Sequence, residues 1–192
     1  MASNKASIQV SPNVVAAYAW LAKPDEGQEF SDGKYKVTLV MEKGDPEIEK
    51  FIETLSTVSK DIATAEFKKL PSNLRMPFKD GDETEKEDFQ GKWLITAKTK
   101  FQPGFVDAGK KQLAVEDCPS SGDLIKASFQ LKAYNTGGNK GVTSQLRNVM
   151  LIEKRNLGQG AAGDFGERNG RHPMSLARGS PDPRRPTVGL AD

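Results

Sequence analysis

The segment Asp123 to Tyr134 constrains the fold more than any other part of the sequence, because its side chains alternate without interruption. One set is apolar and consists of Ile125, Ala127, Phe129, Leu131 and Ala133. The other set is polar and consists of Lys126, Ser128, Gln130, Lys132 and Tyr134. Successive side chains of a strand point to opposite faces, so this pattern predicts a strand with one buried and one solvated face.

The residues after this strand predict a hairpin. The stretch 135–141 is rich in Asn and Gly, which tolerate the positive φ angles that tight turns require. Val142 to Ile152 then reads as another strand. We therefore expect 123–134 and 142–152 to pair with each other.

Further strands are indicated by the same period of two. Residues 8–21 read as extended, and in 34–42 the apolar positions are Tyr35, Val37, Leu39 and Met41. In 92–101 the predicted inward set is Trp93, Ile95, Ala97, Thr99 and Phe101. A short segment, Gln112 to Val115, is predicted as an edge strand after a loop that holds Pro103 and Gly104.

One helix is expected between the strands. Asp45 and Pro46 have the chemistry of an N-cap followed by proline at the first helical position, and apolar residues then recur at steps of three and four. Pro71 disfavours helical geometry in the residue before it, so the helix is predicted to span about 46–69. The acidic stretch Ser72 to Gly91 is expected to be an exposed loop.

These elements predict a mainly β fold, an OB-like antiparallel barrel of five to six strands with one inserted α-helix. A parallel α/β sheet would need alternating helices, which the pattern lacks. We expect residues 1–152 to form this domain. From Glu153 the sequence turns to Gly, Arg and Pro with few large apolar residues, so 153–192 is predicted to be a disordered tail.

Several functional classes are disfavoured by the sequence. The longest apolar run, Val14 to Ala22, is far shorter than the roughly 20 residues of a membrane helix, and the single cysteine, Cys118, excludes an internal disulfide. We expect an intracellular protein that is not an enzyme and needs no metal or cofactor. The acids between Asp80 and Asp88 could be offered as a two-metal nuclease site, but consecutive loop acids usually mark a solvated segment, and His172 lies in the predicted tail.

Lysines on the outer faces of three predicted strands carry the functional hypothesis. They are Lys36 on one strand, Lys98 and Lys100 on the next, and Lys126 and Lys132 on the third. If these strands are neighbours, the lysines form a stripe that can follow phosphates, while Tyr18, Trp20 and Tyr134 supply rings on which any base can stack. The alternative interpretation is that the lysines only keep a barrel soluble and that Tyr18 and Trp20 belong to the core.

Three segments in order resemble the phage single-stranded-DNA-binding proteins related to those of short-tailed bacteriophages. They are Lys34 to Asp45, with a strand and a helix start; Met76 to Asp107, with Pro77 to Asp82, Gly91 to Ile95 and Pro103; and Ala133 to Gly141, with an aromatic-Asn and a Gly-Asn-Lys-Gly element. The order and spacing match over about residues 8–152. The resemblance implies an OB fold with an inserted helix, binding to single-stranded DNA without base specificity, no cofactor, and a role in phage replication and recombination in the host cytoplasm.

The resemblance also implies DNA-facing roles for Tyr134 and Lys140, and Arg147 of the predicted strand 142–152 joins the candidate set. Members of this class usually end in an acidic tail that recruits replication proteins, whereas 153–192 holds seven Lys or Arg against five acids. Either this tail acts differently, for example as an extra DNA contact, or the segment from about Glu167 is translated out of frame or is not native to the protein. A rival function is a phage structural or assembly protein that docks through the helix. The sequence leaves the oligomeric state open.

Overall fold

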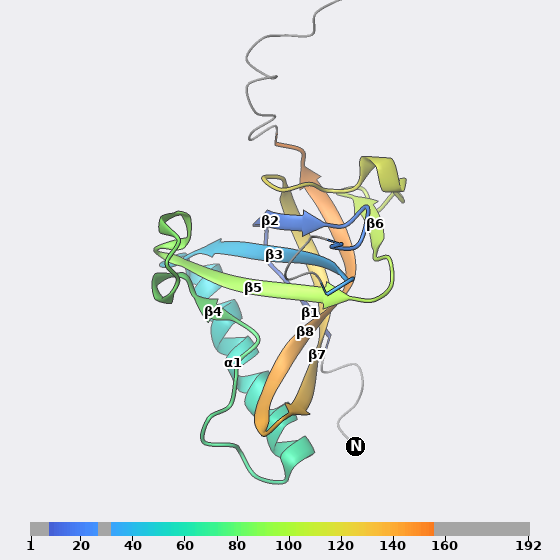
Figure 1. The fold of residues 1–192 in the computed structure, drawn as a ribbon. Helices are drawn as coiled ribbons and strands as arrows, with labels where there is room; N and C mark the ends of the chain where they lie inside the picture. Colours follow the sequence, from blue (N-terminus) through green and yellow to red (C-terminus); the bar gives the residue numbers. More distant parts are fainter. Residues whose placement is uncertain (1–7, 27–31, 156–192) are drawn as a thin grey trace, which may run out of the picture. The chain divides into compact units, whose positions relative to one another are not determined.

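The computed structural model describes residues 8–26 and 32–155 (Figure 1). Strands dominate the described chain, with a single α-helix. The elements are β1 (Ile8–Val10), β2 (Val14–Trp20), β3 (Tyr35–Glu42), α1 (Pro46–Phe67), β4 (Lys79–Asp80), β5 (Lys92–Thr99), β6 (Gly104–Asp107), β7 (Leu124–Thr136) and β8 (Asn139–Glu153), with short 3₁₀ turns at Gly81–Glu83, Glu87–Phe89 and Val115–Asp117. Within these residues no helix is long and apolar enough to cross a membrane.

Five strands close into a ring. β2 pairs with β3, β3 with β5, β5 with β8, β8 with β7, and β7 returns to β2 through Val14 and Val15. Closure removes the sheet edges that would otherwise expose unpaired backbone groups. The predicted OB-like barrel is therefore confirmed.

The sheet contains eight strands, more than the five to six predicted, because the short strands β1, β4 and β6 extend the ring from β7, β5 and β8. Two of its pairings are parallel rather than antiparallel. β8 runs parallel to both β5 and β6. Sequence periodicity specifies which face of a strand is buried but says nothing about its partner or direction, so these pairings were not predicted.

The hairpin of β7 and β8 is confirmed. Its turn consists of Gly137 and Gly138, whose φ angles are 56° and 84°, between the paired residues Thr136 and Asn139. Positive φ at both central residues is the requirement of the tight turns that match strand twist. Because two glycines suffice for the turn, Asn139 to Gly141 belong to the strand instead of to the loop expected from their composition.

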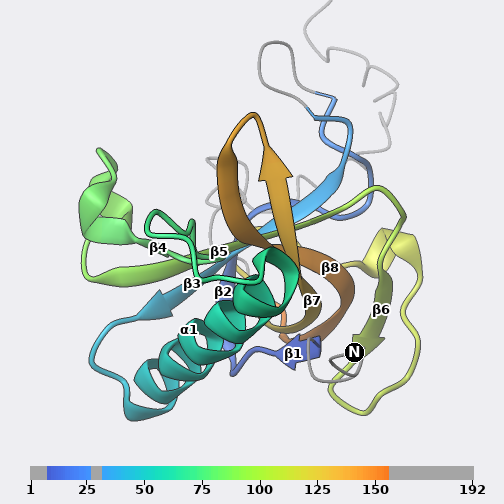
Figure 2. The same cartoon turned by 90° about the horizontal axis from the view of Figure 1, so that it is seen from below.

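Helix α1 begins and ends at residues with recognisable caps. The Asp45 carboxylate accepts hydrogen bonds from the backbone N–H groups of Glu47 (2.8 Å) and Ile48 (3.4 Å), and Lys68 ends the helix with a left-handed φ of 59°. The helix packs against β7 and β8 (Figure 2). Its buried residues are Ile48, Ile52, Leu55, Ser59 and Ala63. The predicted helix is confirmed, and it ends at Phe67 rather than near residue 69.

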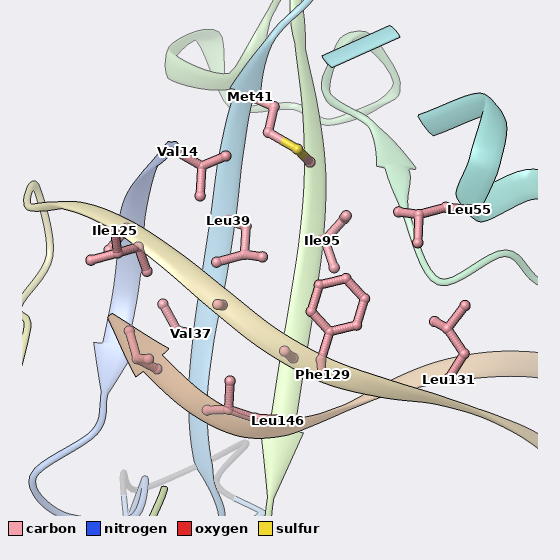
Figure 3. Close-up of a cluster of buried hydrophobic side chains, with 14 of the residues drawn as sticks. Val14, Val37, Leu39, Met41, Leu55, Ile95, Ile125, Phe129, Leu131 and Leu146 are labelled. Atoms are coloured by element: carbon pink, nitrogen blue, oxygen red, sulfur yellow. The ribbon is translucent and has the colours of Figure 1, made fainter. Parts of the chain in front are cut away.

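The barrel interior is filled by the apolar sets that alternation predicted. Leu39, Ile95 and Phe129 are fully buried and converge in the centre of the ring (Figure 3). Phe51 of α1 meets Phe129 edge to face, with ring centroids 6.4 Å apart. The polar sets of β3, β5 and β7 therefore lie on the outside of the barrel.

Three expectations about irregular segments were wrong in whole or in part. The edge strand is Gly104–Asp107 rather than Gln112 to Val115, and Gln112 forms only an isolated bridge to Val106. The acidic stretch 72–91 is largely exposed, as expected, but it is not a loop throughout, because β4 pairs with β5 and Gly81 is buried. Phe101 does not face the core and is 76% exposed. β5 ends at Thr99, so the alternation of inward and outward side chains does not extend to residue 101. Beyond Arg155, the predicted tail lies outside the described residues.

Candidate nucleic-acid interface

A groove follows the outer face of β5. It consists of three adjoining cavities, which we name by position: the Tyr18 cavity (about 390 Å³), the central cavity (about 790 Å³) and the Phe101 cavity (about 260 Å³). The first two share Leu94 and Thr96, and the last two share Lys34 and Lys98. Because each cavity shares lining residues with the next, we describe the three together as one groove along β5.

The floor of the groove is formed by Leu94, Thr96 and Lys98 of β5, with Thr38 of β3 opposite Thr96. The hydroxyl oxygens of Thr38 and Thr96 are 3.2 Å apart and form a hydrogen bond. The floor thus combines short polar and apolar side chains and carries no carboxylate.

Positive charge lines the groove almost without opposition. Its cationic side chains are Lys34, Arg75, Lys79, Lys86, Lys98, Lys100 and Lys132. Glu85 is the single acidic residue among those that line the three cavities. A concave surface lined by one sign of charge concentrates the field and attracts a polyanion.

Aromatic rings occur in all three cavities. Tyr18 and Phe89 line the first, Phe78 and Tyr134 the central one, and Phe101 the last. Tyr18 and Phe101 are 47% and 76% exposed, so large parts of these two side chains are open to solvent. Rings placed between cations are the chemistry that binds unpaired bases.

The wall of the central cavity depends on a glycine. The segment at Arg75 joins the hairpin through two backbone hydrogen bonds, from Arg75 N–H to the Lys140 carbonyl (3.1 Å) and from Val142 N–H to the Arg75 carbonyl (2.8 Å). Gly141 lies between them and opposite Tyr134. A Cβ at this position would lie 2.7 Å from the Tyr134 hydroxyl and 2.8 Å from Arg75 Cβ. Only glycine lets the Tyr134 ring lie this close to the strand.

Tyr18 is held at a bulge of β2. The pairing of β2 with β3 shifts between Ala17 and Trp20, and Tyr18 has a φ of 47°, a left-handed conformation that costs a non-glycine residue about 1 to 3 kcal/mol. The Lys86 ammonium donates to the Tyr18 hydroxyl (2.7 Å) and lies 4.6 Å from the ring centroid. Phe89 meets the same ring edge to face. The bulge thereby presents Tyr18 to the groove.

Two groove-side lysines already have carboxylate partners. Lys98 is paired with Asp32 at 2.8 Å, and this hydrogen bond is the main reason that the pKa of Asp32 lies below its ordinary value. Lys36 is paired with Asp25, and only 19% of its side chain is exposed. Lys98, at 43%, remains accessible to a ligand that displaces Asp32.

The acidic segment beside the groove is tied to the turn before α1. Lys43 pairs with both Asp80 and Asp82. The hydrogen bonds that Lys43 donates to these carboxylates raise its pKa, and the one to Asp80 has the larger effect. The Gly91 N–H donates to Asp82 (2.6 Å) and is the main cause of the lowered pKa of that carboxyl, followed by Lys43. In the described part of the chain, no group of three acids, histidines or cysteines is arranged to hold a metal ion.

The groove gathers half of the predicted site residues. Tyr18, Lys98, Lys100, Lys132 and Tyr134 line it. The predicted stripe is not continuous, however, because β8 lies between β5 and β7.

The other predicted residues lie elsewhere or are engaged. Lys126 lines a separate cavity with Glu47 and Lys50 of α1. Lys140 points its ammonium at the Phe67 ring, 5.2 Å from the centroid. Lys36 is held by Asp25, Trp20 is 43% exposed opposite Lys36, and Arg147 is exposed on β8.

Sequence reasoning missed a second set of groove residues: Lys34, Arg75, Phe78, Lys79, Lys86, Phe89 and Phe101. Most of them belong to segments without strand alternation, where no periodicity indicates a direction. Only the family resemblance touched this region, through the Pro-Phe-Lys-Asp-Gly-Asp run that begins at Pro77.

Comparison with known families gives one match over most of the chain. The model described as "Enterobacter phage Enc34, ssDNA-binding protein" matches residues 8–172. A protein designated p50 from Acyrthosiphon pisum secondary endosymbiont phage 1 is 30% identical over 79 residues, which are 41% of this chain. The match spans 42% of that relative's length.

Solved structures share the fold. The single-stranded DNA-binding protein from bacteriophage Enc34 in complex with ssDNA has a TM-score of 0.67 at 20% identity, over 79% of this chain and 89% of the other. The single-stranded DNA-binding protein gp2.5 encoded by bacteriophage T7 has a TM-score of 0.60 at 26% identity, over 77% and 92%. The barrel with its inserted helix is therefore an architecture that these phage proteins have in common.

Proposed function

The chain belongs to the family of the Enterobacter phage Enc34 single-stranded-DNA-binding protein, and from this premise we propose that it binds single-stranded DNA in the groove along β5, without base specificity. The single observation that carries the assignment to the groove is its lining. Seven cationic side chains and five aromatic rings line this groove with a single carboxylate. The cavity beside α1, which is lined by Lys50, Lys126, Glu47 and Phe51, does not combine these features to this degree.

The chemistry of the lining accounts for tolerance of base sequence. Lysine and arginine side chains recognise phosphates, which are the same at every nucleotide. Stacking uses the face of a base, and all four bases have one. Unpaired bases can reach the rings of Tyr134 and Phe78, whereas bases in a duplex are already stacked and paired, so the groove favours single strands.

We propose that the protein coats and protects single strands during phage DNA replication and recombination inside the host cell. Membership of the family supports this role. Coating a strand requires binding alone and no catalytic step. Any contact with replication or recombination proteins through 153–192 is part of the same proposal.

Docking through α1, the rival function, has less support. The large exposed apolar side chains of the described chain include none from Pro46–Phe67. The helix uses its apolar residues to pack on the barrel, which leaves a solvent face of charged residues and threonines. A protein partner would have no apolar anchor there.

A titration of labelled poly-dT against duplex of equal length tests the proposal. We expect single strands to bind at least about tenfold more tightly, with similar affinities for different base compositions. If each of the seven groove cations neutralises one phosphate, the slope of log K against log salt approaches roughly −5. Equal affinity for duplex, or binding that salt does not weaken, would contradict it.

A further inference from the structure

We infer that Phe101 is a base-stacking platform that marks one end of the DNA-binding groove, with Lys100 and Lys132 holding the phosphates beside the stacked base. This inference rests on the proposed function and deepens it, because it assigns a separate subsite to the Phe101 cavity. Nothing in the sequence pattern indicated it, since alternation placed Phe101 in the core.

The exposure of Phe101 is the first observation. At 76% it is the most exposed of the large apolar side chains in the described chain, ahead of Val10 at 58% and Tyr18 at 47%. β5 ends at Thr99, and the Phe101 N–H donates to the Thr99 hydroxyl at 3.3 Å, which anchors the backbone of the turn. A phenyl ring held outward on an anchored turn gains nothing for the fold and is available to a ligand.

The surroundings of the ring indicate the class of ligand. Lys34, Lys98, Lys100 and Lys132 line the same small cavity, and none of its described lining residues is acidic. The carboxylate of Asp32 pairs with Lys98. An apolar protein surface would have to desolvate these ammonium groups without compensation, whereas a nucleotide offers a base to the ring and a phosphate to the lysines.

The position of the ring sets a length. From Leu94 to Phe101 the chain advances seven residues, or roughly 23 Å at strand spacing. At the roughly 3.4 Å spacing of stacked nucleotides, the groove holds at most about seven nucleotides between the Tyr18 cavity and Phe101. A shorter oligonucleotide can bind in the central cavity without reaching the platform.

Four variants tested with oligo-dT of increasing length examine this subsite: Phe101→Ala, Phe101→Leu, Phe101→Tyr and, as a control, Leu70→Ala, which removes an exposed apolar side chain that lines none of the three cavities. We expect Ala and Leu to weaken binding of long oligonucleotides by about five- to a hundredfold, and Tyr and the control to stay within about twofold. The loss should shrink for oligonucleotides of about three nucleotides. Melting temperatures should not change, because the ring is exposed.

Normal binding by Phe101→Leu would overturn the inference, since an aliphatic side chain cannot stack as a ring does. So would a change in self-association with unaltered DNA binding, which would make Phe101 a contact between copies of the chain. Failure of the wild-type protein to bind any single strand would instead refute the proposed function. The two failures are distinguishable, because the wild-type protein is titrated before any variant is compared with it.

Discussion

Two regions on the outside of the same barrel, the groove along β5 and the cavity beside α1, differ in their charge and in the exposure of their rings. Among the described lining residues, the groove has seven cations against one acid, and its rings include the well-exposed Tyr18 and Phe101. The cavity beside α1 has two lysines, Lys50 and Lys126, against Glu47, and its one ring, Phe51, is packed on the core residue Phe129. Both regions border strands with the same alternating pattern.

The difference teaches that an outward lysine is a candidate binding residue when the cavity around it gathers like charge and exposed rings. Lys98 and Lys126 both follow the outward period of their strands, and Lys98, although paired with Asp32, faces a cavity lined by three further cations. Local charge and exposed rings, rather than net charge, distinguish the two regions.

The largest effect should come from removing charge from the groove. Replacing Lys98, Lys100 and Lys132 together by Ala should lower the magnitude of the salt slope by about two units, at roughly 0.7 per phosphate. At up to about 1 kcal/mol per exposed ion pair, affinity should fall by up to about a hundredfold. Titrations at several salt concentrations measure both.

The matched control replaces Lys50, Lys60 and Lys126 by Ala, which changes the net charge equally on the α1 side. We expect its slope to stay near that of the wild type. Equal losses in the two triple variants would erase the distinction between the regions, because net charge alone would then govern binding.

Removing a ring should come next. Tyr134→Ala should cost about 1 to 3 kcal/mol of single-strand affinity while changing stability little, because the ring lines the central cavity and is not part of the core. Phe129→Ala, on the buried face of the same strand, should cost about 3 to 5 kcal/mol of stability. Both variants are measured by thermal melting and by DNA titration. If Tyr134→Ala unfolds the protein, the side chain of Tyr134 lies on the buried face of the strand and the account is contradicted.

A methyl group should reproduce part of this effect without removing charge or ring. Gly141→Ala places a Cβ within 2.8 Å of both Tyr134 and Arg75, so the ring, the Arg75 segment or both must shift. We expect an affinity loss of about 1 kcal/mol that is not additive with Tyr134→Ala, as for residues in contact. Additive losses in the double variant would show that Gly141 acts through something other than Tyr134.

The smallest change concerns the carboxylate in the groove region. Asp32→Asn should raise single-strand affinity about two- to threefold, the size expected for an exposed ion pair, because Lys98 no longer has a competing partner.

The same ion pair should make stability depend on pH, because the pKa of Asp32 is lowered in the folded state. The pair stabilises the fold at pH values above the ordinary pKa of 3.8, and this stabilisation is lost as the pH falls through the lower pKa of the folded state. Melting the wild type and the variant between about pH 3 and pH 7 should show their difference vanish in acid.

Sequence patterns predicted the fold wherever one strong local signal acted alone. The alternation of Asp123 to Tyr134 defined both faces of β7, the Asp45 and Pro46 pair defined the start of α1, and Gly137 with Gly138 defined the hairpin. Pairing across long sequence separations was not predictable in this way. The parallel pairs of β8 with β5 and β6 depend on closure of the whole ring.

The candidate site was predictable only in part for a related reason. Alternation separates inside from outside, but the outside of a barrel faces every direction, so Lys126 could not be told from Lys98. Phe101 was misplaced because β5 ends at Thr99, which pairs with Tyr35 at the start of β3, and this pairing partner was not known from the sequence. Lys79 and Lys86 lie in segments whose course depends on contacts such as that of Lys43 with Asp80 and Asp82.

Photo-cross-linking of oligo-dT that carries a photoreactive uracil tests the central claim most directly, because it maps bases to residues on the intact wild-type chain. We predict cross-links in peptides that contain Phe78, Phe101 or Tyr134. Cross-links confined to α1 and to Lys126 would place the DNA on the other side of the barrel and would contradict the account.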